Sequence, residues 1–315
     1  MFKRLLVPLD GSRLSSRALP YATEIARRFG AEVILLRVVA PATPVAAPTG
    51  TVPGAASRSM AQMAVQAAMQ EERRNAAHAR RYLSGKTWAI RSQDIEASYG
   101  VRIGDPAQTV RELSQEEHVD LVVMTTHGRS GLKRAIMGSV ADAVVRESGR
   151  PVLVIRPGAG SIIQEEPMFE RILVCLDGST LAEQILPFVQ AQAQHFDSRV
   201  VLLQAVRAAK PKESGETPAF TPVVEEVRDA EEYLEQVARR LRAEGIDVGW
   251  DTVPVLNGAP SEAITKYVRE AEMDLVMLTT HGRSGLKRAV LGSVAGAVVR
   301  GSEKPVLVIR PGSEQ

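Results

Sequence analysis

The chain has 315 residues, of which 44% are hydrophobic and 24% are charged, and its net charge is +2 at pH 7. No dense basic run with interleaved aromatic residues occurs, which argues against a nucleic-acid-binding protein. A single cysteine excludes an internal disulfide, and no run reaches the roughly 18 apolar residues of a membrane-spanning helix. We therefore expect a soluble, cytoplasmic protein that binds neither nucleic acid nor membrane.

Short apolar runs alternate with helical patterns along the first half of the chain. Apolar runs bounded by turn residues predict strands at Arg4–Leu9, Val33–Val39, Ile95–Ile103, Leu121–Thr125 and Val152–Arg156. Helical patterns predict helices at Ser15–Phe29, about Ser59–Leu83, Pro106–Glu117 and Val140–Ser148. Strand runs that are apolar on both faces are typical of buried parallel strands. The run Ala40–Ala56, rich in Pro, Ala, Thr and Gly, predicts a mobile loop.

The second half of the chain repeats the first. The segment MFKRLLVPLDGS at residues 1–12 returns as MFERILVCLDGS at 168–179, and TTHGRSGLKRA returns at 279 after its first appearance at 125. Strands are expected at Ile172–Leu176, Val200–Val206, Val248–Leu256, Leu275–Thr279 and Val306–Arg310. A repeat of this length indicates two duplicated domains rather than a stacked array of short units. We place the domains at residues 1–158 and 168–312.

The alternation of strands and helices predicts parallel sheets with right-handed crossovers. In such sheets, ligands bind beyond the carboxyl ends of the strands. Asp10 follows the first predicted strand, Gly104–Pro106 follows the third, and a glycine-spaced loop follows the fourth. We expect these three segments to converge at one edge of the sheet.

The glycine-spaced loop has the composition of a phosphate-binding segment. Gly128, Gly131 and Gly138 would let a ligand approach the backbone, because glycine has no Cβ. Ser139 is expected to be the N-cap of the helix from about Val140, where free amides and the helix dipole favour an anion. From the local sequence alone, it is equally consistent that the serine only caps and the glycines only turn the chain. The sequence contains no GxxxxGK[ST] phosphate loop.

Several single residues have two interpretations. Asp10 is followed by glycine and serine, so it is either a turn former or a ligand contact, and its place at the sheet edge favours contact. His127 and His281 stand without neighbouring metal ligands, which favours neutral loop histidines over catalytic ones. Arg129 either approaches a phosphate or belongs to a solvated face. Cys175 lies in an apolar strand run, which favours core packing over a reactive thiol.

The segments VPLDGS, GDP and HGRSGLKRAIMGSV followed by PVLVIRP resemble a universal stress protein domain, and the resemblance covers nearly the whole chain, twice. It implies a tandem α/β protein of the Rossmann-like class that includes the adenine nucleotide alpha hydrolases. Each half would be a five-stranded parallel sheet of order 3-2-1-4-5 with helices on both faces.

The ATP-binding branch of that family has a glycine motif that maps onto both halves. Its later glycines and the following serine fall on Gly128, Gly138 and Ser139, and on Gly282, Gly292 and Ser293. Thr125 and Thr279 stand where the family has its first glycine. The resemblance implies ATP with Mg²⁺ held through the phosphates, and no metal ligands from the protein.

The resemblance also assigns the remaining contacts. Asp10 and Asp177 would lie near the ribose and phosphates. The adenine would be lined by Pro8 and Val38 in the first half and by Ala205 in the second, where Cys175 takes the position of Pro8. Met124 and Leu278 would complete the apolar wall of each site. Further candidates for nucleotide contact are Arg129, Gly131, Val140, Arg283, Gly285 and Val294.

The last strand of each half has a different expected role. PVLVIRP is short and apolar and would form an exposed sheet edge, which normally needs covering. The resemblance implies that two domains join through this strand, so Val152–Arg156 would pair with Val306–Arg310 within one chain. Further association into a homodimer remains open.

No paired nucleophile and base occurs in the sequence, which favours a binding protein over an enzyme. We expect an ATP-binding regulatory or stress-response protein without dedicated catalysis. One alternative is a nucleotide-free interaction module, motivated by Thr125 and Thr279. Another is a slow ATPase in which Asp10 or His127 positions a water molecule.

Overall fold

The computed structural model describes residues 1–43, 55–126, 137–156, 168–207, 224–255, 259–280 and 291–312. Its first half contains β1 (Arg4–Pro8), η1 (Ser15–Arg17), α1 (Ala18–Phe29), β2 (Glu32–Val39), α2 (Ala55–Arg91), β3 (Ala97–Ile103), α3 (Pro106–Glu116), β4 (Leu121–Thr125), α4 (Ser139–Glu147) and β5 (Val152–Ile155). The mobile loop expected at Ala40–Ala56 falls mostly outside the described residues.

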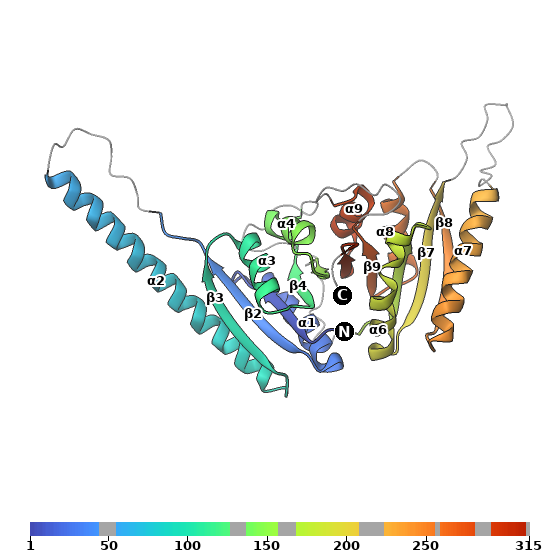
Figure 1. Cartoon of the computed structure of the whole chain (residues 1–315), viewed down its shortest axis with the longest axis horizontal. Helices are drawn as coiled ribbons and strands as arrows, with labels where there is room; N and C mark the ends of the chain where they lie inside the picture. The colour runs from blue at the N-terminus through green and yellow to red at the C-terminus, as the bar shows by residue number, and fades with distance from the viewer. Residues whose placement is uncertain are drawn as a thin grey trace, which may run out of the picture.

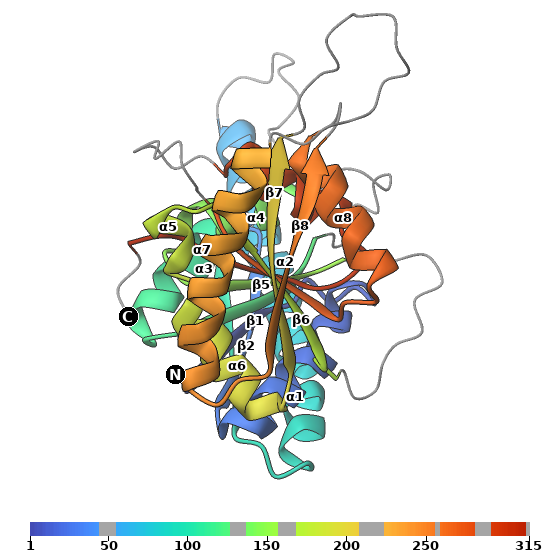
Figure 2. The ribbon, with the colours of Figure 1, turned by 90° about the vertical axis from the view of Figure 1, so that its right-hand side faces the viewer.

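The second half follows the same order of elements. It contains β6 (Arg171–Leu176), α5 (Thr180–Glu183), α6 (Leu186–Phe196), β7 (Arg199–Arg207), α7 (Val224–Ala243), β8 (Val248–Val255), α8 (Pro260–Glu270), β9 (Leu275–Thr279), α9 (Ser293–Gly301) and β10 (Val306–Ile309). Helices cover both faces of the strands, and Figure 2 shows α7 and α8 on opposite faces of β7 and β8. The predicted α/β class is confirmed.

Each half contains the predicted strand order, and the two halves share one sheet. The order is β3-β2-β1-β4-β5 in the first half and β10-β9-β6-β7-β8 in the second. The sequence predicted a five-stranded sheet in each half, whereas the structure joins the two into a single ten-stranded sheet (Figure 1). Strands within a half are parallel. The outer edges are therefore β3 and β8, not the PVLVIRP strands.

The seam between the halves is an antiparallel pair. Val306 lies opposite Val154, Leu307 opposite Leu153, and Val308 opposite Val152. All of these side chains are at least 98% buried. The predicted pairing of the two PVLVIRP strands is confirmed, and it removes the apolar edge that each half would otherwise expose.

One predicted helix is longer than expected. The sequence pattern placed its end near Leu83, but α2 continues to Arg91. Ser84 and Gly85 do not end it, because Leu83, Thr87 and Ile90 recur at helical spacing and are at least 97% buried. Packing against the sheet thus overrides the weak helix propensity of the Ser-Gly pair.

Buried residues of both halves form a shared core on each side of the sheet. On one side, aromatic rings bridge α1 and α6. The ring centroids of Phe2 and Phe188 are 6.1 Å apart, and those of Phe29 and His195 are 3.9 Å apart. On the other side, Val144 of α4 and Val298 of α9 belong to one cluster of buried residues. The two halves therefore pack as one body around the seam.

Candidate functional site

The second half has a cavity of about 410 Å³ at the carboxyl ends of β6, β7 and β9. Its lining includes every described second-half residue that the sequence singled out for ligand contact: Asp177, Ala205, Leu278, Thr279, Gly292, Ser293 and Val294. Cys175, the counterpart of Pro8, lines it too. The second-half counterparts of the segments expected to converge meet here as far as they are described: Asp177, Pro260 and the two ends of the glycine-spaced loop, at Thr280 and Gly292, all line the cavity. Gly282, Arg283, Gly285 and His281 lie outside the described residues.

The corresponding first-half residues occupy the same positions in the fold. Pro8 ends β1, Val38 lies near the end of β2, and Met124 and Thr125 end β4. The register of β1 with its neighbours places Leu6 beside Val122 and Pro8 beside Leu36, so these strand ends lie at one edge. Gly138, Ser139 and Val140 stand at the start of α4. Gly128, Arg129, Gly131 and His127 lie outside the described residues.

Gly138 and Gly292 are needed for a close approach within the chain itself. The amide of Gly292 donates a 2.9 Å hydrogen bond to the carbonyl of Thr280, and that of Gly138 donates a 2.8 Å bond to Thr126. A Cβ on Gly292 would lie 2.6 Å from the Thr280 oxygen, and one on Gly138 would lie 2.8 Å from the Thr126 oxygen. No larger side chain fits at these distances, so each glycine fixes the helix start against the end of the preceding strand.

The expectation that Ser139 caps its helix is wrong. Gly138 is the N-cap of α4 and Gly292 that of α9, and neither helix has a side-chain cap hydrogen bond. The helix begins one residue earlier than expected because the Gly138 carbonyl already accepts the amide of Asp142, at 2.9 Å. Ser139 and Ser293 are the first helical residues, and both are exposed. Ser293 therefore reaches the cavity as a side chain not engaged in capping.

Asp10 and Asp177 form the turn after the first strand of each half. An Asp10 carboxylate oxygen accepts the amide of Ser12 at 2.9 Å. The matching oxygen of Asp177 accepts the amide of Ser179 at 3.0 Å and its hydroxyl at 2.6 Å. The glycine between them has φ of 82° in the first half and 81° in the second, a left-handed conformation that favours glycine. The turn-forming role is thus present, and in the second half it holds the carboxylate at the cavity wall.

Cys175 packs against the buried cluster on the α8 and α9 side of the sheet and lines the cavity. Burial raises the pKa of its thiol to about 12. The thiol is therefore protonated near neutral pH, and a protonated thiol is a poor nucleophile. This agrees with the packing role expected from the sequence.

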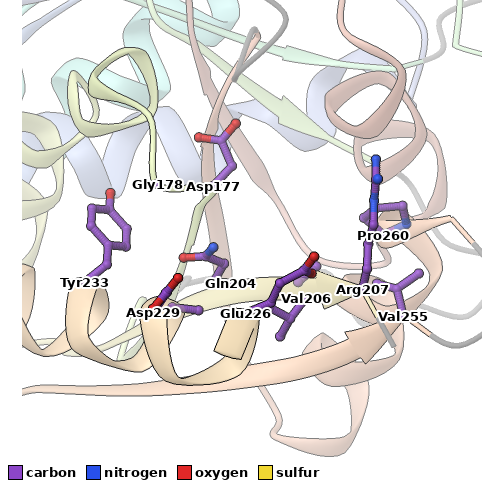
Figure 3. Close-up of a pocket in the computed structure, with 12 residues that line it drawn as sticks. Asp177, Gly178, Gln204, Val206, Arg207, Glu226, Asp229, Tyr233, Val255 and Pro260 are labelled. Atoms are coloured by element: carbon purple, nitrogen blue, oxygen red, sulfur yellow. The ribbon is translucent and has the colours of Figure 1, made fainter. Parts of the chain in front are cut away.

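A second cavity, of about 560 Å³, opens between β7 and α7 (Figure 3). Its lining adds residues that sequence reasoning did not single out: Gly178, Gln204, Val206, Arg207, Glu226, Asp229, Ala230, Tyr233 and Val255. Asp177 belongs to both cavities. The available signal was the spacing of Glu226, Asp229 and Tyr233, which puts them on one face of a helix. Burial raises the pKa of Tyr233, and the Glu183 carboxylate adds to the shift, so its phenol remains a hydrogen-bond donor.

Among the residues that the structure describes, no helix combines the length and apolar character needed to cross a membrane. Within the same residues, no group of three or more histidine, cysteine, aspartate or glutamate side chains is placed to hold a metal ion.

Comparison with known proteins finds the same family in both halves of the chain. The model of the universal stress protein family matches residues 1–156 and again residues 168–310. A universal stress protein of Mycobacterium tuberculosis is 33% identical over 210 residues, which cover 65% of this chain and 66% of that protein. One from Mycolicibacterium smegmatis is 26% identical over 322 residues, covering 98% of this chain and 97% of its own length.

Solved structures show the same fold over the full length. A universal stress protein from Archaeoglobus fulgidus superposes with a TM-score of 0.69 at 21% identity, with 98% of each chain covered. One from Pseudomonas aeruginosa superposes with a TM-score of 0.63 at 17% identity, covering 98% of this chain and 94% of that one. The chain belongs to the universal stress protein family and carries two copies of its domain in tandem.

Proposed function

We propose that this chain is an ATP-binding regulatory or stress-response protein without dedicated catalysis, and that the nucleotide binds at the cavity of about 410 Å³ at the carboxyl edge. One observation carries the proposal. All the described second-half residues that the glycine motif and its neighbours single out line this one cavity. Its volume lies within the range of roughly 300–1,000 Å³ typical of small-molecule sites.

The chemistry of the lining supports a nucleotide and suggests its orientation. The first-turn amides of α9 and the positive end of its dipole attract phosphate. The Asp177 carboxylate repels phosphate but accepts hydrogen bonds from hydroxyl groups, so the ribose belongs beside it. Leu203 and Leu278 are buried apolar residues of the wall and suit the flat face of adenine. Mg²⁺ would be held through the phosphates and would neutralise part of their charge.

An added charge at Ser293 tests the proposal in the full-length chain. Ser293→Asp places a carboxylate in the first turn of α9, where it favours the helix but repels phosphate. We expect ATP with Mg²⁺, measured by calorimetry, to bind at least about tenfold more weakly to this variant, since one lost charged hydrogen bond is worth about that factor. Ser139→Asp makes the same change in the first half and tells which half binds.

The matched control is Gln236→Glu, which adds the same charge at an exposed position of α7 that lines neither cavity. We expect its ATP affinity to equal that of the unmodified chain. Binding stabilises the folded state by about 2.7 kcal/mol at a hundredfold excess over the dissociation constant, so a thermal shift should accompany the heat. No heat and no shift with millimolar ATP would overturn the proposal and favour the nucleotide-free interaction module.

A further inference from the structure

The cavity between β7 and α7 adjoins the proposed nucleotide site, and the two linings share Asp177, Ala205, Arg207 and Pro260. Successive side chains of a strand point to opposite faces of the sheet. Leu203 belongs to the buried cluster on the α8 and α9 side, so the next residue, Gln204, points to the α7 side. Asp229 and Tyr233 reach this space from α7, facing Gln204 and the turn at Asp177 (Figure 3).

A buried acceptor lies in the wall of this cavity. Gln204 is 6% exposed, and its Oε1 has no hydrogen-bond partner among the described residues. Buried side-chain oxygens in folded proteins are nearly always paired, because removing one from water without a donor is unfavourable. The amide lies in the space between Asp177 and Asp229 in Figure 3. A ligand that donates hydrogen bonds would satisfy it.

The first half shows what occupies the equivalent place there. Pro8 and Cys175 hold equivalent positions, and the strand registers pair Pro8 with Leu36 and Cys175 with Leu203. Leu36 and Leu203 are therefore equivalent. The residues that follow them, Arg37 and Gln204, are counterparts. Arg37 is 8% exposed, and its guanidinium occupies the space where a Cβ on Gly11 would stand. The Cζ atom of Arg37 is 5.5 Å from the centre of the Tyr82 ring. The chain's own guanidinium thus lies between the strand-end turn and a tyrosine.

The second half keeps the tyrosine and the turn, but Gln204 replaces the cation of Arg37, and the cation that remains in the described lining is Arg207. Tyr233 matches Tyr82, since a fully buried leucine, Leu234 or Leu83, follows each of them. The shorter Gln204 leaves the cavity of about 560 Å³ open. By the same alignment, Glu226 and Asp229 stand where the first half has Asn75 and His78. The second half has therefore exchanged a buried cation for two additional carboxylates at the rim.

We propose that this cavity binds a small organic cation with a guanidinium or primary amine group. Its cationic end would take the place that the Arg37 guanidinium takes in the first half. The cation would donate hydrogen bonds to Gln204 Oε1 and lie against the Tyr233 ring, where a cation–π contact adds attraction. Asp177, Glu226 and Asp229 would supply the opposite charge. The site adjoins the proposed nucleotide site and shares Asp177 with it, but cation binding in the absence of nucleotide does not rest on the proposed function.

Calorimetry with agmatine, which has a guanidinium at one end and an amine at the other, tests the proposal on the full chain without nucleotide. We expect saturable binding of one agmatine per chain that weakens as salt is added. Gln204→Arg should abolish it, because the new side chain repeats the first-half arrangement. Asp229→Asn should weaken it about tenfold through loss of a charged partner.

The matched control is Glu232→Gln, which removes the same charge from the same helix at a residue outside the cavity lining. We expect it to leave agmatine affinity unchanged. The proposal is overturned if millimolar agmatine gives no saturable heat, or if Gln204→Arg binds as well as the unmodified chain. If Asp229→Asn and Glu232→Gln weaken agmatine binding equally, the attraction comes from the acidic helix in general and the proposed site is overturned. Should Gln204→Arg fail to fold, the agmatine affinities of Asp229→Asn and Glu232→Gln still decide whether the site exists.

Discussion

Gly292 shows how one residue serves the fold and the site together. Its amide hydrogen-bonds to Thr280 while its carbonyl accepts the amide of Gly296 at 2.8 Å, so it links the end of β9 to the first turn of α9. The first-turn amides that would meet a phosphate are positioned by this contact. The requirement for glycine here is therefore structural first, and the site depends on it.

We expect Gly292→Ala to destabilise the chain by about 1–3 kcal/mol, the usual range for overpacking, because its Cβ would meet a backbone oxygen that cannot easily move. Urea unfolding measures the change. Gly85→Ala is the matched control. A Cβ at Gly85 meets no atom within 4 Å, and the residue lies inside α2. There we expect a gain of about 0.5–1 kcal/mol, because alanine favours the helix. Equal stability of Gly292→Ala and the unmodified chain would contradict this account.

At the scale of elements, the seam of β5 and β10 joins the halves with only a few residues. Leu153 is 1% exposed and its partner Leu307 is 2% exposed, and both belong to the same buried cluster. Cross-strand pairs of apolar residues are the units that stabilise a sheet. The short strands therefore depend strongly on these two side chains.

Leu153→Ala should lower the free energy of unfolding by about 2–5 kcal/mol, the range for a leucine removed from a packed core. Met63→Ala, at a residue of α2 that is 64% exposed, should change the free energy of unfolding by no more than about 0.5 kcal/mol. In a double-mutant cycle, Leu153→Ala and Leu307→Ala should couple by about 0.5 kcal/mol or more, because the side chains face each other. If the two losses of unfolding free energy, measured by urea denaturation, simply add in the double variant, the two side chains do not interact across the seam.

The elements also show what the sequence could predict. Apolar strand runs such as Leu275–Thr279 were located to the residue, because burial on both faces leaves little ambiguity. The end of α2 was missed, since it depends on packing of Thr87 and Ile90 that local propensity does not encode. The cap at Gly138 was missed for a related reason: it depends on contact with Thr126, which is distant along the chain. The cavity of about 410 Å³ could be predicted from motifs at strand ends, but the second cavity required knowing where α7 lies against β7.

At the scale of the whole molecule, both sheet faces are covered by cores that cross the seam. The contact between Phe2 and Phe188 and the hydrogen bond from Arg310 Nη1 to the Arg146 carbonyl, at 3.1 Å, join the halves away from the strands. Such shared burial couples the stability of one half to that of the other.

We expect the chain to unfold in one transition. The chain has two tryptophans, and Trp88→Phe leaves Trp250 as a fluorescent reporter of the second half alone. Its urea transition should coincide with that of far-ultraviolet circular dichroism, which reports on both halves, because coincident probes mark a two-state change. A dichroism change that continues after the Trp250 signal is complete would show that the halves unfold separately.

The antiparallel seam has a consequence for how the two copies vary. In an assembly of two identical chains, every substitution appears twice, on both sides of the symmetry axis. Here each position is encoded separately, so Arg37 and Gln204 coexist at equivalent places in one sheet. A fused pair can thus place a guanidinium of its own in one copy and a shorter amide in the other, an asymmetry that a symmetric pair of identical chains does not have.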